Sequence, residues 1–343
     1  MKALVMTKPG ELVFEDRPKP SPKDGEVLFK ILHVGICGSD ISAFKGKQPF
    51  FSYPRVVGHE LVVQAAEIPA SSVTPALNYK EGDILSILPY ISCGKCIACR
   101  KGRTNCCTSL KVLGVHVDGG LQEYISLPAQ YGVAAAGLNA LDIALVECFA
   151  IGFHSVRRAN PVEGEAALVV GTGPIGIGVI HGLKERGLKV IAMDINDKRL
   201  NYAKDTAKAD FVINSKESDP EKALSDITGG EGASLVVDAT GNAGQMMKAF
   251  DYASAAATVV YAGLVRDEIC FSDPLLHAKE ISLLTSRNAT KEDFENVIAG
   301  IKSGRLNTQG FVTHRATLDE TPSNFVSWTM PETGCIKAVV ELP

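Results

Sequence analysis

The chain has 343 residues, of which 45% are hydrophobic and 22% are charged, and its formal net charge is −4. This length and composition predict two globular domains, and the acidic balance argues against a nucleic-acid partner. With no signal peptide, no run of 18 apolar residues and nine cysteines in the sequence, we expect no membrane span and a cytoplasmic location, where thiols stay reduced.

The first half of the chain has the pattern of strands separated by Gly, Pro and Asp. Apolar, strand-like runs occupy residues 26–37, 59–68, 83–90 and 120–128. We therefore predict a β-rich domain in which the cysteine-rich segment around residues 90–110 is inserted as a loop.

From about residue 150 the pattern changes to short β-branched runs separated by helical stretches. These runs occupy residues 166–171, 189–194, 211–215, 234–240, 258–263 and 281–287. This alternation is typical of βαβ units and a parallel sheet buried on both faces. A helix pattern at 292–304 and a strand at 335–342 follow, and this tail is expected to fold back onto the first domain. The sequence thus predicts an α/β protein with one domain at 1–149 and 288–343 and the other at 150–287.

Four cysteines form the pattern C-x2-C-x2-C-x7-C, which lets neighbouring sulfurs converge on one ion. The pattern predicts a closed structural zinc site. Disulfide pairing and an iron–sulfur cluster are the alternatives, but the short spacing disfavours the first and the missing x3-Cys-Pro ending disfavours the second. Cys106 is interpreted as a bystander. The predicted ligands are Cys93, Cys96, Cys99 and Cys107.

A glycine-rich turn follows the strand at 166–170 and opens a helix, which is the context of a dinucleotide-binding loop. The predicted cofactor contacts in this loop are Gly171, Gly173, Pro174, Ile175 and Gly176. Asp194 ends the next strand, where a carboxylate accepts ribose hydrogen bonds and repels a 2′-phosphate, so we predict NAD rather than NADP. Thr240 ends a later strand and is a further predicted contact. The alternative is a glycine-rich turn in a sheet without a cofactor.

A second group of possible metal ligands is dispersed along the chain. Cys37 ends one strand, His59 and Glu60 begin another, and Glu147 lies near the domain boundary. Taken singly, each residue also has an ordinary role as a packed or solvated side chain. Sequence spacing alone does not show that they converge.

Five motifs occur in order along the chain: GICGSD, GHE, the four-cysteine pattern, DGGLQEY and GTGPIG. Together they resemble the zinc-dependent medium-chain alcohol dehydrogenase superfamily over essentially the whole chain. Glutamate at position 147, where classical alcohol dehydrogenases have cysteine, is similar to the polyol, sorbitol and threonine dehydrogenase branch. The stretches QPFFSYPRVVGHE, GRTNCC, GVHVDGG, FSDPLLH and SRNAT resemble the bacterial L-galactonate 5-dehydrogenases and related sugar-acid dehydrogenases.

The resemblance implies a GroES-like catalytic domain, a Rossmann domain and two zinc ions per chain. It implies that Cys37, His59 and either Glu60 or Glu147 hold the catalytic zinc, and that Ser39 accepts the substrate proton. The further cofactor contacts that we expect are Arg199, Arg287 and Lys337. Two departures from the family stand out: Ser42 replaces a relay histidine, and Cys148 replaces a proline, for which we expect a packing role.

We therefore expect an NAD- and zinc-dependent dehydrogenase that oxidises a secondary alcohol of a sugar acid or polyol to a ketone. The resemblance also implies a homo-oligomer, either a dimer or a tetramer. A sorbitol-type or L-threonine-type dehydrogenase is the alternative within the family. Outside it, the alternatives are a non-catalytic NAD-binding protein and a zinc-free reductase on the same scaffold.

Overall fold

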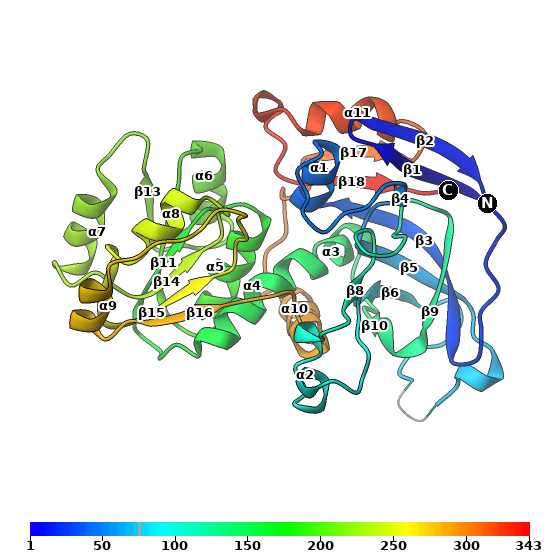
Figure 1. The fold of residues 1–343 in the computed structure, drawn as a ribbon, viewed down its shortest axis with the longest axis horizontal. Coiled ribbons are helices and arrows are strands. Elements are labelled where there is room, and N and C mark those ends of the chain that lie inside the picture. The colour runs from blue at the N-terminus through cyan, green and yellow to red at the C-terminus, as the bar shows by residue number, and fades with distance from the viewer. Residues whose placement is uncertain (75–76) are drawn as a thin grey trace. The chain divides into compact units, whose positions relative to one another are not determined.

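The computed structural model describes residues 1–74 and 77–343 and divides into two compact units (Figure 1). The first unit contains Met1–Glu147, Thr290–Lys302 and Gly310–Pro343. The second unit contains Cys148–Ala289 and Ser303–Gln309. The predicted fold class, a β-rich unit joined to an α/β unit, is confirmed, and the short segment 303–309 returns to the second unit before the chain ends in the first.

The second unit is built on a parallel six-stranded sheet with the order β13-β12-β11-β14-β15-β16. Its strands are β11 (Ala166–Val170), β12 (Lys189–Asp194), β13 (Phe211–Asn214), β14 (Ala233–Asp238), β15 (Ala253–Tyr261) and β16 (Ser282–Thr285). Its helices are α5 (Pro174–Glu185), α6 (Asp197–Asp205), α7 (Pro220–Thr228), α8 (Ala243–Lys248) and α9 (Asp273–Lys279), and α4 (Val146–Ala159) leads into it. This strand order is that of the Rossmann fold, whose strand order reverses between β11 and β14.

The first unit is mainly antiparallel β-structure. Its largest sheet has the order β10-β6-β5-β3-β18-β17, with β9 also paired to β3, and a smaller sheet has the order β2-β1-β4. The strands of the two sheets are β1 (Lys2–Lys8), β2 (Glu11–Asp16), β3 (Glu26–Ile36), β4 (Arg55–Val56), β5 (Glu60–Glu67), β6 (Ile84–Ile87), β9 (Tyr124–Pro128), β10 (Gly132–Ala134), β17 (His314–Thr317) and β18 (Ala338–Glu341). The helices are α1 (Gly38–Phe44), α2 (Ile97–Arg100), α3 (Ala140–Ala144), α10 (Lys291–Lys302) and α11 (Thr321–Trp328).

The last strand, β18, lies inside this sheet, next to the edge strand β17. Strand β18 pairs antiparallel with β3, with Ala338 opposite Ile36, and parallel with β17. The residues before and after the second unit are thereby joined in one sheet, which explains why the predicted tail strand does not form a domain of its own.

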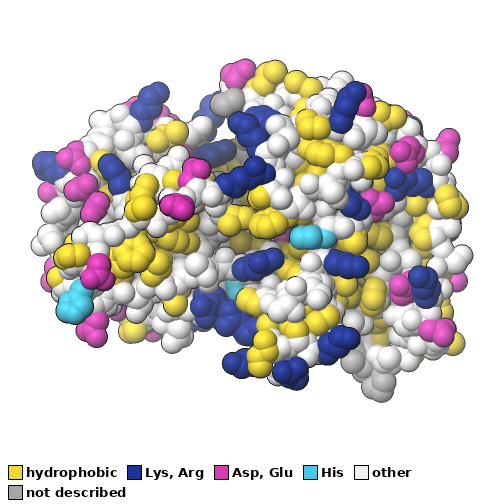
Figure 2. All heavy atoms as spheres, viewed as in Figure 1, with side chains coloured by type: hydrophobic (Ala, Val, Ile, Leu, Met, Phe, Trp, Pro, Cys, Tyr) yellow, Lys and Arg dark blue, Asp and Glu magenta, His cyan; other side chains and the backbone are white. Residues whose placement is uncertain are grey.

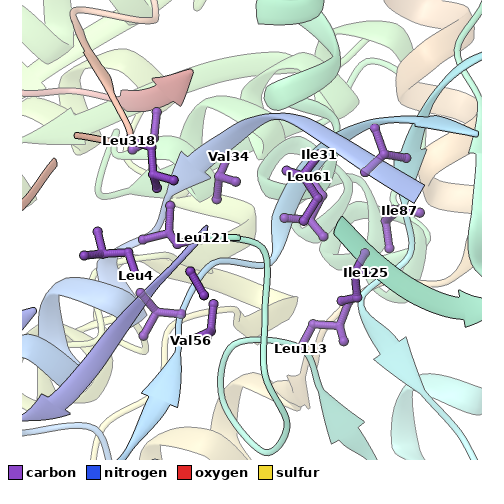
Figure 3. Close-up of a cluster of buried hydrophobic side chains, with 14 of the residues drawn as sticks. Leu4, Ile31, Val34, Val56, Leu61, Ile87, Leu113, Leu121, Ile125 and Leu318 are labelled. Atoms are coloured by element: carbon purple, nitrogen blue, oxygen red, sulfur yellow. The ribbon is translucent and has the colours of Figure 1, made fainter. Parts of the chain in front are cut away.

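The core of the first unit lies between its strands, where side chains from β1, β3, β5 and the loop before β9 meet (Figure 3). Leu4, Val34, Leu61 and Leu121 are at most 1% exposed. Burying one such side chain contributes roughly 1.5–3 kcal/mol, so this cluster fixes the register of β3 and β5, whose adjoining ends carry the candidate site. Among the described residues, no helix is both long and apolar enough to cross a membrane.

Candidate metal centres and nucleotide site

The four predicted structural-zinc cysteines converge in a small lobe. Strands β7 (Tyr90–Ile91) and β8 (Lys111–Val112) pair at its base, with Tyr90 opposite Val112. The ligand atoms of Cys93, Cys96, Cys99 and Cys107 all lie within 4.8 Å of one another. Sulfurs bound to one tetrahedral zinc at about 2.3 Å are separated by less than about 4 Å, so this group fits a zinc ion with little rearrangement.

Backbone N–H groups of the lobe point at these sulfurs. The amides of Cys93 and Ser109 donate to the Sγ atom of Cys107, at 3.2 and 3.3 Å. The amides of Cys99 and Thr108 lower the pKa of the Cys96 thiol to about 5. Lys95, Arg100 and Lys101 are exposed around α2, and basic side chains surround this lobe in Figure 2. Both effects favour a thiolate at Cys96, which is the form that binds a metal, whereas burial and the hydrogen bond with Cys96 raise the pKa of the Cys99 thiol to about 11.

The dispersed candidate ligands Cys37, His59 and Glu60 also come together. Cys37 follows β3 and Glu60 opens β5, and the antiparallel register places Gly35 opposite Glu60. The ligand atoms of the three side chains lie within 4.8 Å of one another. A Cβ atom on Gly35 would lie 2.1 Å from the Oε2 atom of Glu60, so the glycine makes room for the carboxylate.

Asp40 lies behind this group and was not predicted from the sequence. Its carboxylate accepts the backbone N–H of Cys37 at 2.9 Å, because Asp40 is the third residue of helix α1, and lies 3.7 Å from the Nδ1 atom of His59. Burial lowers the pKa of His59, but Asp40 and Cys37 outweigh it and raise that pKa well above its ordinary value. A carboxylate behind a histidine is the arrangement that orients a metal-binding imidazole.

The two candidate glutamates have different partners. Glu60 forms a buried ion pair with Lys337, whose side chain is 1% exposed. Glu147, at the start of α4, accepts a hydrogen bond from the hydroxyl of Tyr90 and is not among the grouped ligands of the described chain. Burial raises the pKa of Glu147 and, together with the charge of Glu147, that of Tyr90. The sequence prediction missed Tyr90, which stands three residues before the first lobe cysteine.

In the second unit the glycine loop lies where the sheet order reverses. Gly171 has a φ of +90° and follows β11, and helix α5 begins at Pro174. A Cβ atom on Gly176 would lie 1.8 Å from the carbonyl oxygen of Gly171, and one on Gly171 would lie 2.9 Å from the Cγ2 atom of Thr240. The loop is therefore tight enough to require glycine, and its backbone and the N-terminus of α5 can approach a pyrophosphate.

Asp194 ends β12 beside this loop. Its Oδ2 atom accepts hydrogen bonds from the backbone N–H and the hydroxyl of Thr172, at 2.7 and 2.9 Å, and its Oδ1 atom accepts the N–H of Ile195 at 2.7 Å. The guanidinium of Arg199 comes to 4.0 Å from where a Cβ atom on Gly173 would lie. The Asp194 carboxylate thus lies beside the loop, where it could accept hydrogen bonds from an adenosine ribose, and the Arg199 guanidinium lies near enough to the loop to meet a phosphate.

The remaining candidates have less defined surroundings. The Oγ atom of Ser39 is shielded from solvent and has no hydrogen-bond partner among the described residues. Arg287 is exposed after β16, and Cys148 is buried at 3% exposure, consistent with packing. Lys337 is paired with Glu60, and its contact with a pyrophosphate stays a prediction.

Two family models match the two halves of this architecture. Residues 23–136 match the alcohol dehydrogenase GroES-like domain, and residues 174–303 match the zinc-binding dehydrogenase domain. The chain therefore belongs to the zinc-dependent alcohol dehydrogenase family, as its sequence motifs predicted, and it is an oxidoreductase of that class.

Individual relatives show which dehydrogenases of this family the chain is similar to. The chain is 42% identical to the L-galactonate-5-dehydrogenase of Escherichia coli K12, over 94% of each chain. It is 31% identical to a sorbitol dehydrogenase of Halalkalibacterium halodurans, over 93% of this chain and 94% of that one. A crystal structure of an Escherichia coli CFT073 alcohol dehydrogenase complexed with NADH matches with a TM-score of 0.91 and 30% identity, over 99% of each chain.

Proposed function

We propose that this protein is a zinc- and NAD-dependent dehydrogenase that oxidises a secondary hydroxyl of a sugar acid to a ketone. The convergence of Cys37, His59 and Glu60 carries the proposal, because three protein ligands leave a zinc position open for a substrate oxygen. The 42% identical relative, which is a sugar-acid dehydrogenase by name, supports a hexonate as substrate. Sorbitol-type and threonine-type relatives keep a polyol or an amino alcohol as second candidates.

The residues present fit this chemistry. Cys37, His59 and Glu60 would hold the catalytic zinc, and Cys93, Cys96, Cys99 and Cys107 would hold the structural zinc. When bound, zinc supplies the Lewis acidity that lowers the pKa of a coordinated hydroxyl, and NAD supplies the hydride acceptor.

The protein's own groups hold these ligands and the proton. Asp40, 3.7 Å from the Nδ1 atom of His59, would attract and orient that ring, and Lys337 balances the buried charge of Glu60. Ser39, two residues after Cys37, has a buried hydroxyl with no hydrogen-bond partner among the described residues, so it could take up the substrate proton while passing its own proton on toward solvent. Gly171, Asp194 and Arg199 would hold the pyrophosphate and ribose of NAD.

Steady-state oxidation of a panel of hexonates and hexitols with NAD, followed by the absorbance of the reduced cofactor, tests the substrate class. His59→Ala should lower kcat/KM by more than about 10³-fold and remove one of two zinc ions, because a metal's Lewis-acid effect contributes several kcal/mol. It should leave NADH binding largely intact, since the Rossmann unit makes its own contacts with the cofactor.

Zinc content separates the other classes. Two zinc ions per chain are expected for the enzyme, one for a binding protein that keeps only the lobe, and none for a zinc-free reductase. Full activity in a His59→Ala protein that lacks its second zinc would rule out the proposed mechanism.

A further inference from the structure

We propose that Asp238 is a positioning residue for NAD, which acts by holding the Thr240 hydroxyl inside the turn after β14 and does not itself contact the cofactor. The inference rests on the proposed function, because it concerns the nucleotide site of that enzyme. The sequence predicts a cofactor contact at Thr240, but in the structure its hydroxyl is already bound within the protein.

Asp238 is a buried carboxylate at the end of strand β14. It is 0% exposed, and no lysine or arginine of the described residues forms an ion pair with it. Burial raises the pKa of this carboxyl, and hydrogen bonds from Thr240 and Gly241 oppose that rise. Because a buried charge is costly unless it is hydrogen-bonded, the carboxylate favours the one conformation of the turn that supplies these donors.

The Thr240 hydroxyl has no proton left for a ligand. Its Oγ1 atom lies 3.0 Å from both carboxylate oxygens of Asp238, so its single proton is donated there. The same oxygen accepts the backbone N–H of Asn242 at 3.1 Å, and the Thr240 N–H donates to the Oδ1 atom of Asp238 at 3.1 Å. A pyrophosphate oxygen only accepts hydrogen bonds, so the hydroxyl could bind it only by leaving Asp238.

The turn that Asp238 holds lies where the order of the sheet reverses, between β11 and β14. Thr240 is exposed there, and a Cβ atom on Gly171 would lie 2.9 Å from its Cγ2 atom. The backbone N–H of Ala239 donates to the carbonyl oxygen of Val170, the last residue of β11, at 2.8 Å. A dinucleotide crosses a Rossmann sheet at this reversal, so the position of the turn sets the space beside the glycine loop.

The strand does not depend on the Asp238 side chain. The main-chain carbonyl oxygen of Asp238 accepts the N–H groups of Ala262 and Gly263, at 2.9 and 3.0 Å, and β14 pairs along its length with β11 and β15. Loss of the carboxylate should therefore loosen the turn without unfolding the sheet. We expect it to weaken binding of the whole dinucleotide more than binding of its adenosine half, which lies beside Asp194.

The test compares Asp238→Ala with Asp293→Ala as a matched control. Asp293 is 1% exposed and lies in the first unit, and it accepts the backbone N–H and the hydroxyl of Thr290, both at 2.8 Å. Its loss therefore removes the same kind of buried pair outside the Rossmann unit. Binding of NADH and of AMP to each protein is measured by titration calorimetry, because AMP occupies only the adenosine half of the site.

In Asp238→Ala we expect NADH to bind about 10-fold more weakly, in the range for loss of one hydrogen bond, and AMP to bind within about two-fold of the wild type. Asp293→Ala should match the wild type with both ligands. Thr240→Val should weaken NADH by a similar factor, and the double variant should be no weaker than Asp238→Ala, because both substitutions break the same bond. Asp238→Asn should bind NADH like the wild type, since its amide oxygen still accepts both Thr240 groups.

Unchanged NADH affinity in Asp238→Ala would overturn the proposal. Additive losses in the double variant would also overturn it, because they would show that the Thr240 hydroxyl contacts NAD directly. Equal losses of NADH and AMP affinity would show instead that the substitution disturbs the whole unit, which is a merely structural role.

Two variants give an answer if Asp238→Ala fails to fold. The proposal then requires wild-type NADH binding in Asp238→Asn, and weaker NADH binding with unchanged AMP binding in Thr240→Val. These measurements need no turnover, so they stand even if no alcohol in the panel is oxidised and the proposed substrate class fails.

Discussion

The buried ion pair between Lys337 and Glu60 should contribute differently to the stability of the metal-free and of the zinc-loaded protein. The side chains are 1% and 0% exposed. Replacing Lys337 by Met keeps most of the volume but leaves Glu60 as a buried carboxylate without its cation. Breaking a buried pair in this way costs about 3–5 kcal/mol, so Lys337→Met should destabilise the chelator-treated protein by that amount.

In the zinc-loaded protein the same substitution should cost much less. There Glu60 faces the two positive charges of the metal, and we expect a loss near the ~1 kcal/mol of an average point substitution. Binding of zinc should therefore stabilise Lys337→Met by about 2–4 kcal/mol more than it stabilises the wild type, the difference between these two costs.

The fluorescence of Trp328 during urea unfolding measures both costs. It is the single tryptophan of the chain, is 7% exposed and lies in the first unit, so it reports on the unit that contains the pair. Lys2→Met is the control, because Lys2 and Asp319 form an exposed pair in the same unit, with side chains 40% and 71% exposed. Its loss should cost less than about 1 kcal/mol with or without zinc. Equal losses in the stripped and loaded Lys337→Met proteins would refute the reasoning.

Three further predictions concern other parts of the chain. Cys96→Ser should remove the lobe zinc and lower the melting temperature more than it changes the chemistry of the Cys37 site, and unchanged zinc content and melting would contradict a structural role. Asp194→Ala should weaken NAD and improve NADP, measured as kcat/KM for each cofactor, and a wild type that already prefers NADP would contradict it. Burial lowers the pKa of His181 from 6.5 to about 4, so as pH falls through this window the unfolded chain takes up a proton that the folded chain does not, and stability is lost. His181→Leu should therefore lose about 2 kcal/mol less than the wild type between pH 7 and pH 5, measured by calorimetry, and parallel pH profiles would show that His181 does not titrate this way.

Local patterns made much of this architecture predictable. Successive lobe cysteines have only two to seven residues between them, so their convergence is decided by short turns. The conformation of the loop from Gly171 to Gly176 is likewise determined by its own residues, because a Cβ atom at Gly176 would clash with the Gly171 carbonyl oxygen. The βαβ alternation gave the parallel sheet for the same reason, since each strand run and helix run is a local signal.

The partners within the Cys37 site were not predictable in the same way. Tyr90 meets Glu147 only because β7 and the start of helix α4 come together in the fold, and Lys337 meets Glu60 only because β18, β3 and β5 take a particular register. A one-residue slip of β5 against β3 would turn Glu60 to the opposite face of the sheet. The sequence near Glu60 does not indicate which of these registers the two strands adopt. Asp40 did leave a local signal: an acid three residues after Cys37 is typical of a helix N-terminus, where it accepts the backbone N–H of the capping residue that precedes the helix.

Strand β18, near the very end of the chain, sits between β3 and β17 and follows directly after Lys337. During synthesis all six strands of the Rossmann sheet emerge before β17 and β18, and this sheet can form first because domains generally fold as they emerge. In the first unit, β3 has an unpaired edge until β18 has emerged, and Glu60 lacks the positive charge of Lys337. Emergence of β18 is therefore the event that closes the sheet and completes the Glu60 pair, so a chain from which β18 is missing would carry a formed nucleotide fold and an unfinished metal site.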